Sequence, residues 1–215
     1  MDYTRQLEAY STSEVSDALD ACGISGGLLS IKPLTPGLKL VGPAYTVSYS
    51  LYEKKPKLFQ NAANYIDAVP SQAVIVIDNG GREDCTTWGD ILTQVACQKK
   101  IAGTIVNGAV RDVACIRTAR YPVYCKAIYM CSGKNRVYKS GEQCPLNIDG
   151  VTIHPGDIIF ADDDGVLAIP LSLVGEVIAK AKNIKAAEKK IIAAVKAGSS
   201  LEQARKDYHY DKPWQ

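Results

Sequence analysis

The middle third of the chain alternates continuous apolar runs with segments of helical periodicity. Residues 73–77 and 101–106 are apolar and rich in β-branched side chains, as expected of strands that are covered on both faces. Helices are predicted to begin near Gly89 and to cover residues 113–119, and a further strand is predicted to start at Pro122. Such alternation of buried strands and helices is typical of a parallel α/β layer.

Helical patterns also occupy both ends of the chain. The Ser-Thr-Ser-Glu sequence of residues 11–14 is a capping signal, which predicts a helix with Thr12 or Ser13 as its N-cap. A long amphipathic helix is predicted over about residues 173–197, and a polar tail over residues 199–215.

The segments between the first helix and the α/β layer carry weaker signals. Residues 38–41 and 45–49 have strand character, and Pro43 between them indicates a strand edge or a bulge. Residues 59–69 are predicted to be helical, and residues 78–81, Asp-Asn-Gly-Gly, to form a turn.

From Ile148 onward the pattern becomes that of hairpins. Short apolar strands alternate with turn signals at residues 149–150, 155–157 and 163–165. There is no internal repeat, low-complexity linker or break in composition. The sequence therefore predicts a single α/β domain over residues 1–215.

Composition excludes several classes of function. The chain has 215 residues, of which 47% are hydrophobic, and a formal net charge of only +2. Because phosphate neutralisation requires clustered excess cations, this balance argues against a nucleic-acid partner. No run of about 18 apolar residues predicts a membrane span, and residues 1–8 lack the regions of a secretory signal. The seven cysteines show no C-x-x-C spacing, which favours reduced thiols and a cytoplasmic location.

Candidate chemistry gathers where a predicted strand meets two helix starts. Asp90 opens one helix, and Arg111 and Asp112 follow the carboxyl end of the strand, where ligands bind in open α/β sheets. The amides of Ile91 and Leu92 offer an anion two donors, and Arg111 can hold a carboxylate through two N–H groups. With only two histidines in the chain, any metal is expected to be held by oxygens, and Asp90 with Asp112 could hold a hard divalent cation. Alternatively, both aspartates are helix caps, the commoner role of Asp at a helix start.

A third acidic residue, Glu188, falls within the apolar stripe of the C-terminal helix. It lies four residues after Ile184 and three before Ile191. A carboxylate on a packing face is costly unless it is paired, hydrogen-bonded or near a cation. Either the helix packs on a neighbour and places Glu188 in a polar site there, or the apolar stripe ends before Glu188 and its carboxylate is exposed to solvent.

Three motifs taken together resemble the RraA-like family. They are Gly-Asp-Ile-Leu at residues 89–92, the segment over residues 103–112 that ends in Arg-Asp, and the segment over residues 155–167 that contains Asp-Asp-Asp-Gly. The resemblance implies a compact α/β sandwich with a swivelling β/β/α-type core. It also implies trimers, or hexamers of paired trimers, with active sites between subunits.

The enzymatic branch of this family comprises class II 4-hydroxy-4-methyl-2-oxoglutarate / 4-carboxy-4-hydroxy-2-oxoadipate aldolases. By resemblance, Asp112 binds Mg²⁺ or Mn²⁺, and Asp90 holds a metal-bound water. Arg111 contacts the pyruvate part of the substrate. Glu188, supplied by a neighbouring subunit, matches the family's remaining acidic residue and acts through water. The substrate carboxylate is bound at the helix start by Gly89, Ile91 and Leu92.

The resemblance implies a carbon–carbon lyase that cleaves a 4-hydroxy-2-oxo acid to pyruvate, with oxaloacetate decarboxylation as a side activity. The alternative is a non-catalytic RraA-type regulator that binds a ribonuclease or another protein. That branch typically lacks the aspartate after the arginine, so Asp112 favours the aldolase. Asn107 is a departure, because many relatives carry Asp before the glycine, and it bears on substrate preference. The sequence leaves open which 4-hydroxy-2-oxo acid is the substrate.

Overall fold

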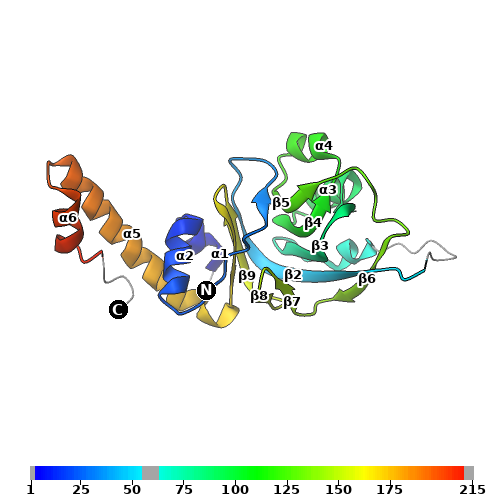
Figure 1. Ribbon diagram of the computed structural model, residues 1–215, viewed down its shortest axis with the longest axis horizontal. Helices are drawn as coiled ribbons and strands as arrows, with labels where there is room; N and C mark the ends of the chain where they lie inside the picture. The colour runs from blue at the N-terminus through cyan, green and yellow to red at the C-terminus, as the bar shows by residue number, and fades with distance from the viewer. Residues whose placement is uncertain (1–2, 55–62, 211–215) are drawn as a thin grey trace.

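The architecture is organised around a mixed β-sheet of eight strands, seen in a computed structural model that describes residues 3–54 and 63–210 (Figure 1). Seven strands follow one path across the sheet: β1 (Lys32–Pro33), β5 (Val123–Ile128), β4 (Gly103–Val110), β3 (Val74–Trp88), β2 (Leu40–Leu51), β9 (Ile158–Asp162) and β10 (Gly165–Ile169). The eighth, β6 (Val137–Glu142), pairs with β2, and β7 (Leu146–Ile148) and β8 (Val151–Ile153) form a separate hairpin. These strands confirm the predicted α/β class.

Helices cover the sheet at its two ends (Figure 1). Beside the parallel strands lie α3 (Asp90–Gln98), α4 (Val113–Thr118) and the 3₁₀ turn η1 (Asn64–Ala68). Beside β9 and β10 lie α1 (Tyr3–Leu7), α2 (Thr12–Asp20), the 3₁₀ turn η2 (Leu171–Leu173) and the start of α5 (Val174–Lys196). The rest of α5 leaves the sheet as an arm, against whose far end α6 (Leu201–Asp207) folds back.

Strand β2 joins the two halves of the sheet. It runs parallel to β3 through residues 44–48, and β3, β4 and β5 continue in parallel. On its other side it is antiparallel to β9 through residues 40–43 and to β6 through residues 47–51. The carboxyl ends of β3 and β4 therefore point to the same edge of the sheet, next to the starts of α3 and α4.

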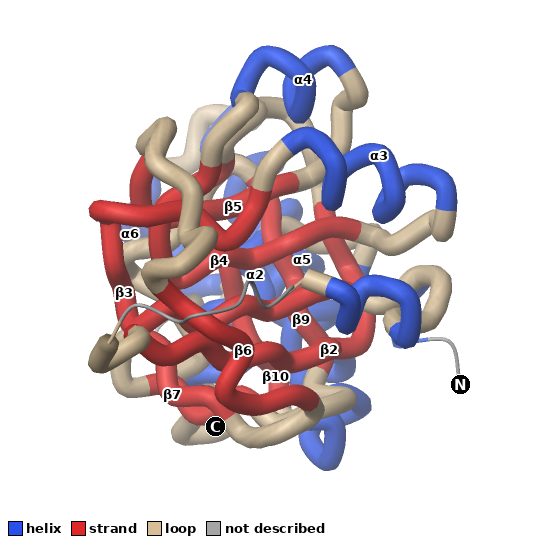
Figure 2. Tube along the Cα trace, turned by 90° about the vertical axis from the view of Figure 1, so that its right-hand side faces the viewer, coloured by secondary structure: helices blue, strands red, loops and turns tan. Residues whose placement is uncertain are grey.

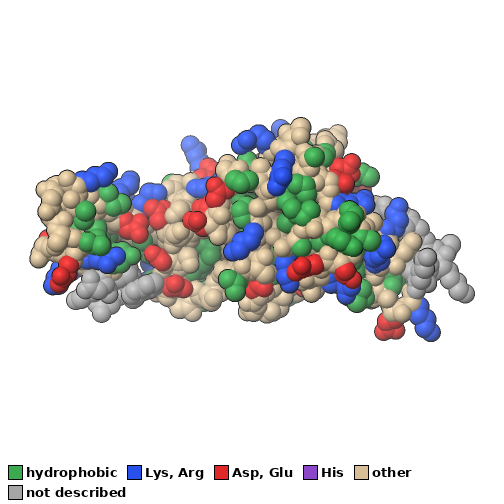
Figure 3. All heavy atoms as spheres, turned by 45° about the horizontal axis from the view of Figure 1, so that its top comes forward, with side chains coloured by type: hydrophobic (Ala, Val, Ile, Leu, Met, Phe, Trp, Pro, Cys, Tyr) green, Lys and Arg blue, Asp and Glu red, His purple; other side chains and the backbone are tan. Residues whose placement is uncertain are grey.

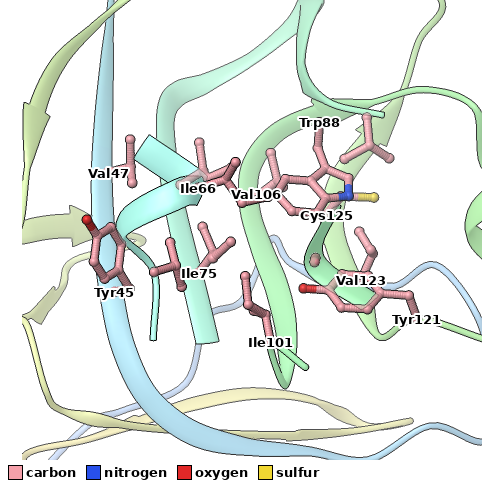
Figure 4. Packing of buried hydrophobic residues seen from close by; sticks show 14 of the residues in the cluster. Tyr45, Val47, Ile66, Ile75, Trp88, Ile101, Val106, Tyr121, Val123 and Cys125 are labelled. Carbon is pink, nitrogen blue, oxygen red and sulfur yellow. The ribbon is translucent and has the colours of Figure 1, made fainter. Parts of the chain in front are cut away.

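Three apolar clusters hold these layers together. The first packs Trp88, Val106 and Ile116 between the sheet and helices α3 and α4. Figure 4 shows Trp88 and Val106 among the residues of this cluster. The second seats the β7–β8 hairpin on the opposite face, where Ile148 is fully buried. Figure 2 shows β7 on one side of the sheet and helices α3 and α4 on the other. The third packs α2 and α5 on β9 and β10 around Phe160. Both faces of the parallel strands are thus covered, which explains their continuous apolar runs.

The N-cap of α2 is Ser11, so the prediction of Thr12 or Ser13 was wrong by one or two residues. The Ser11 hydroxyl accepts a hydrogen bond from the Glu14 amide at 3.2 Å, and the Glu14 carboxylate accepts one from the Ser11 amide at 2.9 Å. Thr12 instead donates its hydroxyl hydrogen to Asp162, which ties the start of α2 to the end of β9. Its side chain is therefore directed to the sheet rather than to the helix amides.

The segment predicted as a turn at residues 78–81 belongs to strand β3. Gly80 and Gly81 adopt positive φ angles of 62° and 68°, and the register with β4 shifts between Asp78 and Arg82. The Asn107 side-chain amide on β4 donates to the Asp78 carboxylate at 2.8 Å, which holds the two strands together beside the irregularity. The glycines therefore produce an irregularity within one strand instead of a reversal.

Pro43 also lies within a continuous strand. Its neighbour Ala44 donates its amide hydrogen to Asp157, toward β9, so the nitrogen of Pro43 faces the side of β3. Pairing with β3 begins only at Ala44, and no ladder bond is lost there.

Other predictions are resolved in part. Of the helix predicted over residues 59–69, residues 59–62 lie outside the described residues, and residues 64–68 form the 3₁₀ turn η1. The predicted polar tail contains α6, capped by the Ser200 hydroxyl.

All seven cysteines are described and none forms a disulfide. Among the described helices, none combines the length and the apolar character needed to span a membrane. On the face in Figure 3, acidic and basic side chains are interspersed along body and arm.

Candidate active site

The ends of β3 and β4 bring the predicted site residues together. Trp88, the last residue of β3, pairs with Val110 of β4, and the Arg111 amide donates to the Trp88 carbonyl at 3.1 Å. Gly89 then caps α3, and Asp112 caps α4. Two helix starts that are far apart in sequence are thus fixed side by side by strand pairing.

Asp112 links these two helix starts. Its carboxylate oxygen Oδ2 accepts a hydrogen bond from the Asp90 amide at 3.0 Å and lies 3.4 Å from Nε of Arg111. Asp112 adopts a left-handed backbone conformation with φ of 58°. Asp adopts this conformation more readily than most residues, and seven other described non-glycine residues also have positive φ, so the angle alone does not mark a functional site. What distinguishes Asp112 is that its carboxylate contacts both the Asp90 amide and Arg111.

Gly89 is required by the closeness of this carboxylate. A Cβ atom added to Gly89 would lie 2.6 Å from Oδ2 of Asp112 and 3.3 Å from Nε of Arg111. The backbone there is extended, with φ of −170°, so the constraint is steric crowding and not the glycine conformation. Gly89 thus makes room for the Asp112–Arg111 pair.

The helix start of α3 is partly satisfied by its own first residue. The Ile91 amide, predicted to bind a substrate carboxylate, donates to Oδ1 of Asp90 at 2.7 Å. Within the described residues, no protein group accepts a hydrogen bond from the Leu92 amide. The N-cap of α3 is Gly89 and that of α4 is Asp112, so the alternative interpretation, in which both aspartates are helix caps, holds by position for Asp112 and not for Asp90. Leu92 is the amide left for an anion.

A cavity of about 350 Å³ opens in front of this cluster. Gly89, Asp90, Leu92 and Arg111 line one part of it. The remaining wall includes Tyr49, whose pKa is raised by burial, so that its hydroxyl stays protonated. Another part of the lining comes from the end of β3 and from the loop before β6: Thr86, Thr87, Ser132, Gly133 and Lys134.

Glu188 does not reach this cavity within one chain. It lies half-buried on α5. Figure 1 shows α5 at the β9 end of the sheet and α3 and α4 at the other end. Burial, and then the charges of Glu14 and Asp17 on α2, raise the pKa of its carboxyl group. A role for Glu188 at this site therefore requires a second subunit.

The carboxylates present suit a hard cation but do not complete its shell within one chain. Asp90 and Asp112 offer oxygen donors, which Mg²⁺ and Mn²⁺ prefer. In the part of the chain that the structure describes, no cluster of three or more Asp, Glu, His or Cys residues could hold a metal ion. Hydrated Mg²⁺ commonly uses only one or two carboxylates, so this donor pair fits such an ion.

Sequence reasoning missed the loop that forms the far wall of the cavity. Residues 129–136 lie beside β3 because the Thr86 amide donates to the Cys131 carbonyl and the Gly133 amide to the Thr86 carbonyl, both at 2.9 Å. In the sequence of this loop, Gly133 is the residue that could have indicated a close approach to another strand. A Cβ added there would lie 2.6 Å from the Thr86 carbonyl oxygen. Only the folded chain shows which strand this glycine approaches.

Comparisons with known proteins agree with this geometry. A model of the RraA-like family (Aldolase/RraA) matches residues 12–168. Protein DlpA of Legionella pneumophila is 61% identical over 210 residues, which make up 98% of this chain and 34% of DlpA. This chain therefore spans about a third of the length of that relative.

Two further proteins resemble almost the whole chain. A protein of Halalkalibacterium halodurans, whose name proposes a 4-hydroxy-4-methyl-2-oxoglutarate aldolase, is 35% identical over 188 residues, covering 86% of this chain and 85% of that protein. The crystal structure of an uncharacterized protein from Pseudomonas syringae pv. tomato has 42% identity and a TM-score of 0.90, over 96% of this chain and 93% of that one. On the family match and these similarities, the chain belongs to the RraA-like family.

Proposed function

We propose that this protein is a divalent-metal-dependent aldolase that releases pyruvate from 4-hydroxy-4-methyl-2-oxoglutarate or a related 4-hydroxy-2-oxo acid. The observation that carries the proposal is the Asp112 carboxylate, which is fixed by the Asp90 amide beside Arg111 at the edge of the cavity. A regulator that works by surface docking has no need for this arrangement. The aldolase name of a relative supports the same reaction class.

Asp112, with Asp90 through water, would hold Mg²⁺ or Mn²⁺. When bound, such a cation supplies Lewis-acid polarisation of the substrate's 2-oxo group.

The protein's own groups bind and orient the 2-oxo acid. The Leu92 amide at the start of α3 and the Arg111 guanidinium both line the cavity and can receive the substrate's carboxylate and 2-oxo oxygens. Cleavage of the C3–C4 bond leaves its electron pair on the pyruvate fragment as an enolate. Arg111 stabilises the negative charge that develops on the enolate oxygen.

Proton transfer completes the reaction. The 4-hydroxyl proton must leave as the new carbonyl forms, and C3 of the enolate must gain one. Asp90 on the cavity wall, and Glu188 of the partner subunit, would pass these protons through water. Decarboxylation of oxaloacetate yields the same enolate, so it is expected as a second activity.

The test is pyruvate release from 4-hydroxy-4-methyl-2-oxoglutarate and from oxaloacetate, with Mn²⁺ or Mg²⁺ and then with excess EDTA. Asp112→Asn is expected to reduce metal-dependent turnover by on the order of 100-fold, the upper end of what changes around a bound metal ion typically cause. Asp149→Asn is the matched control, because Asp149 also has a left-handed φ, of 52°, and also accepts a backbone amide hydrogen, from Ser30. Turnover that survives both EDTA and Asp112→Asn would refute the proposal.

We further propose that the site is shared between subunits of a trimer or hexamer. Asp112→Asn and Glu188→Ala subunits, each inactive alone, are expected to regain a fraction of the activity when mixed oligomers form. Sedimentation of an active monomer would contradict the shared site.

A further inference from the structure

The turn from β3 into α3 contains a glycine that cannot be replaced without displacing Asp112. A Cβ at Gly89 would lie 2.6 Å from Oδ2 of that aspartate. Glycine also has more conformational freedom than any other residue, so by itself it fixes the direction of the chain poorly. Asp90 follows directly, and the hydrogen bond from its amide to Asp112 requires a constant direction. The turn therefore needs a restraint from another part of the chain.

The hydroxyl of Thr93 provides such a restraint. Thr93 lies in α3 and is fully buried. Its hydroxyl donates to the Gly89 carbonyl at 2.9 Å and accepts a hydrogen bond from the Trp88 indole N–H at 3.0 Å. The Thr93 amide donates to the same carbonyl at 3.1 Å. One hydroxyl thus bonds both the last side chain of β3 and the backbone of the residue that follows it.

Trp88, the second partner of this hydroxyl, is itself held by the core. Its ring stacks on that of Tyr121, with the ring centroids 6.0 Å apart and the planes 11° from parallel. The Tyr121 hydroxyl shares a hydrogen bond of 3.0 Å with the hydroxyl of Thr104 on β4. The Trp88 carbonyl accepts the amide hydrogen of Arg111 at 3.1 Å. Through Thr93, the Gly89 turn is therefore bonded to a side chain whose position is fixed by packing.

Thr93 lies behind the cavity and does not line it. Trp88, Gly89 and Asp90 are in the lining, so any effect of Thr93 on a bound substrate acts through them. Threonine in a helix commonly bonds the carbonyl four residues earlier, which is a local interaction. The bond from the Trp88 indole goes beyond that local pattern, because it joins the helix to the side chain of a strand. Both the donor and an acceptor site of the buried hydroxyl are used.

We propose that Thr93 is a positioning residue, which fixes the turn at Gly89 and so places Asp90 and Asp112 for the reaction. The inference rests on the proposed aldolase function and adds to it a residue outside the cavity on which the rate depends. Loss of the hydroxyl removes one of the two donors to the Gly89 carbonyl and leaves the Trp88 indole N–H buried without its acceptor. The turn then gains conformations in which the Asp90 amide no longer meets Asp112.

The test compares Thr93→Val, which removes the hydroxyl at nearly constant shape, with Thr93→Ser, which keeps it. In Thr93→Val, kcat for Mn²⁺-dependent decarboxylation of oxaloacetate is expected to fall by about 10-fold, as a displacement of less than about 1 Å can cause. KM should change by less than about 3-fold, because Arg111 still binds the substrate. Thr93→Ser should keep the wild-type kcat. If Thr93→Val does not fold, Thr93→Ala and Thr93→Ser differ by the hydroxyl alone and make the same comparison.

Thr46→Val is the matched control. Thr46 is also fully buried, and its hydroxyl also donates to a backbone carbonyl, that of Cys144, at 2.6 Å. The loss of this hydrogen bond should lower Tm by about 2–4 °C and leave kcat unchanged. Thr93→Val loses two hydrogen bonds and should lower Tm somewhat more. A general loss of stability would lower kcat in both variants, whereas a positioning role lowers it only in Thr93→Val.

Hydrogen exchange in the presence of Mg²⁺ tests the positioning without any turnover. The Asp90 amide is protected by its bond of 3.0 Å to Asp112. In Thr93→Val its exchange, followed by mass spectrometry on a peptide that contains residues 89–92, should become about 5-fold faster, which corresponds to about one hydrogen bond. Thr46→Val and Thr93→Ser should leave the exchange unchanged.

The outcomes separate failure of the positioning role from failure of the aldolase. Wild-type kcat in Thr93→Val would overturn the positioning role and leave the aldolase intact, whether or not exchange at Asp90 is faster. An equal fall of kcat in Thr93→Val and Thr93→Ser would also overturn it, because the hydroxyl would not be the group that matters. A wild-type protein without Mn²⁺-dependent turnover would refute the aldolase, and the positioning role with it.

Discussion

Replacing Gly89 by alanine tests whether the position of the Asp112 carboxylate governs activity. The new Cβ would lie 2.6 Å from Oδ2 of Asp112, whereas ordinary van der Waals contact begins at 3.4 Å. The extended backbone of Gly89 tolerates alanine, so the strain falls on Asp112 and Arg111. The carboxylate must retreat by roughly 1 Å, and misplacement on that scale can cost on the order of 100-fold in rate.

The cost to folding is expected to be much smaller. Displacing Asp112 weakens its hydrogen bond with the Asp90 amide, which is worth about 1 kcal/mol. For a chain of this length, that corresponds to a fall in Tm of about 2–4 °C. Gly89→Ala should therefore remain folded while its Mn²⁺-dependent decarboxylation of oxaloacetate falls by about 100-fold.

Gly175→Ala is the matched control. It lies in α5, where the nearest atom to an added Cβ is 3.9 Å away, so it should keep full activity. Thermal unfolding, Mn²⁺ affinity by calorimetry and oxaloacetate turnover are measured on both variants. A Gly89→Ala protein with wild-type turnover and Mn²⁺ affinity would show that the placement of Asp112 does not limit the chemistry.

Three further outcomes are expected. Ser11→Ala removes the α2 capping box and should cost about 1 kcal/mol, seen as a Tm decrease that Ser13→Ala does not reproduce. Glu142→Gln should lower Tm at pH 7, because hydrogen bonds from Lys139 and then from Tyr45 hold the pKa of Glu142 below 4.5 in the folded state. Stabilisation from a lowered carboxyl pKa is present above the unfolded value and disappears as pH falls through the folded value. A Tm difference that did not shrink as the pH was lowered would contradict the assignment. Excess EDTA should abolish pyruvate release, and Mn²⁺ should restore it; no restoration would indicate that EDTA acts by another route.

Most of the fold could be predicted from the sequence, because the spacing of apolar residues along a strand or helix indicates which of its faces are buried. The strands at residues 73–77 and 101–106 were identified from runs that only two-sided coverage explains. The errors occurred where a polar side chain had two possible partners. Thr12 could cap α2 but bonds Asp162 instead. The glycines at 80 and 81 could reverse the chain but form an irregularity within β3, beside the hydrogen bond from Asn107 to Asp78. Such choices depend on residues that are distant in sequence.

The candidate site was predictable to a similar extent. The placement of Asp90 near Asp112 follows from the parallel order of β3 and β4, and the structure brings them within one hydrogen bond. The use of the Ile91 amide by Asp90 could not be predicted, because it depends on the side-chain rotamer of Asp90. The loop that carries Ser132 and Lys134 had no periodic signal, because only its pairing with Thr86 gives it a position.

The left-handed backbone at Asp112 also affects how this chain tolerates mutation. Glycine at that position would relieve backbone strain of order 1 kcal/mol, but it would also remove the carboxylate that accepts the Asp90 amide hydrogen, a bond worth about 1 kcal/mol. Because the two contributions nearly cancel, Asp112→Gly is expected to change the free energy of unfolding by little. The loss of this carboxylate would therefore leave no mark on stability.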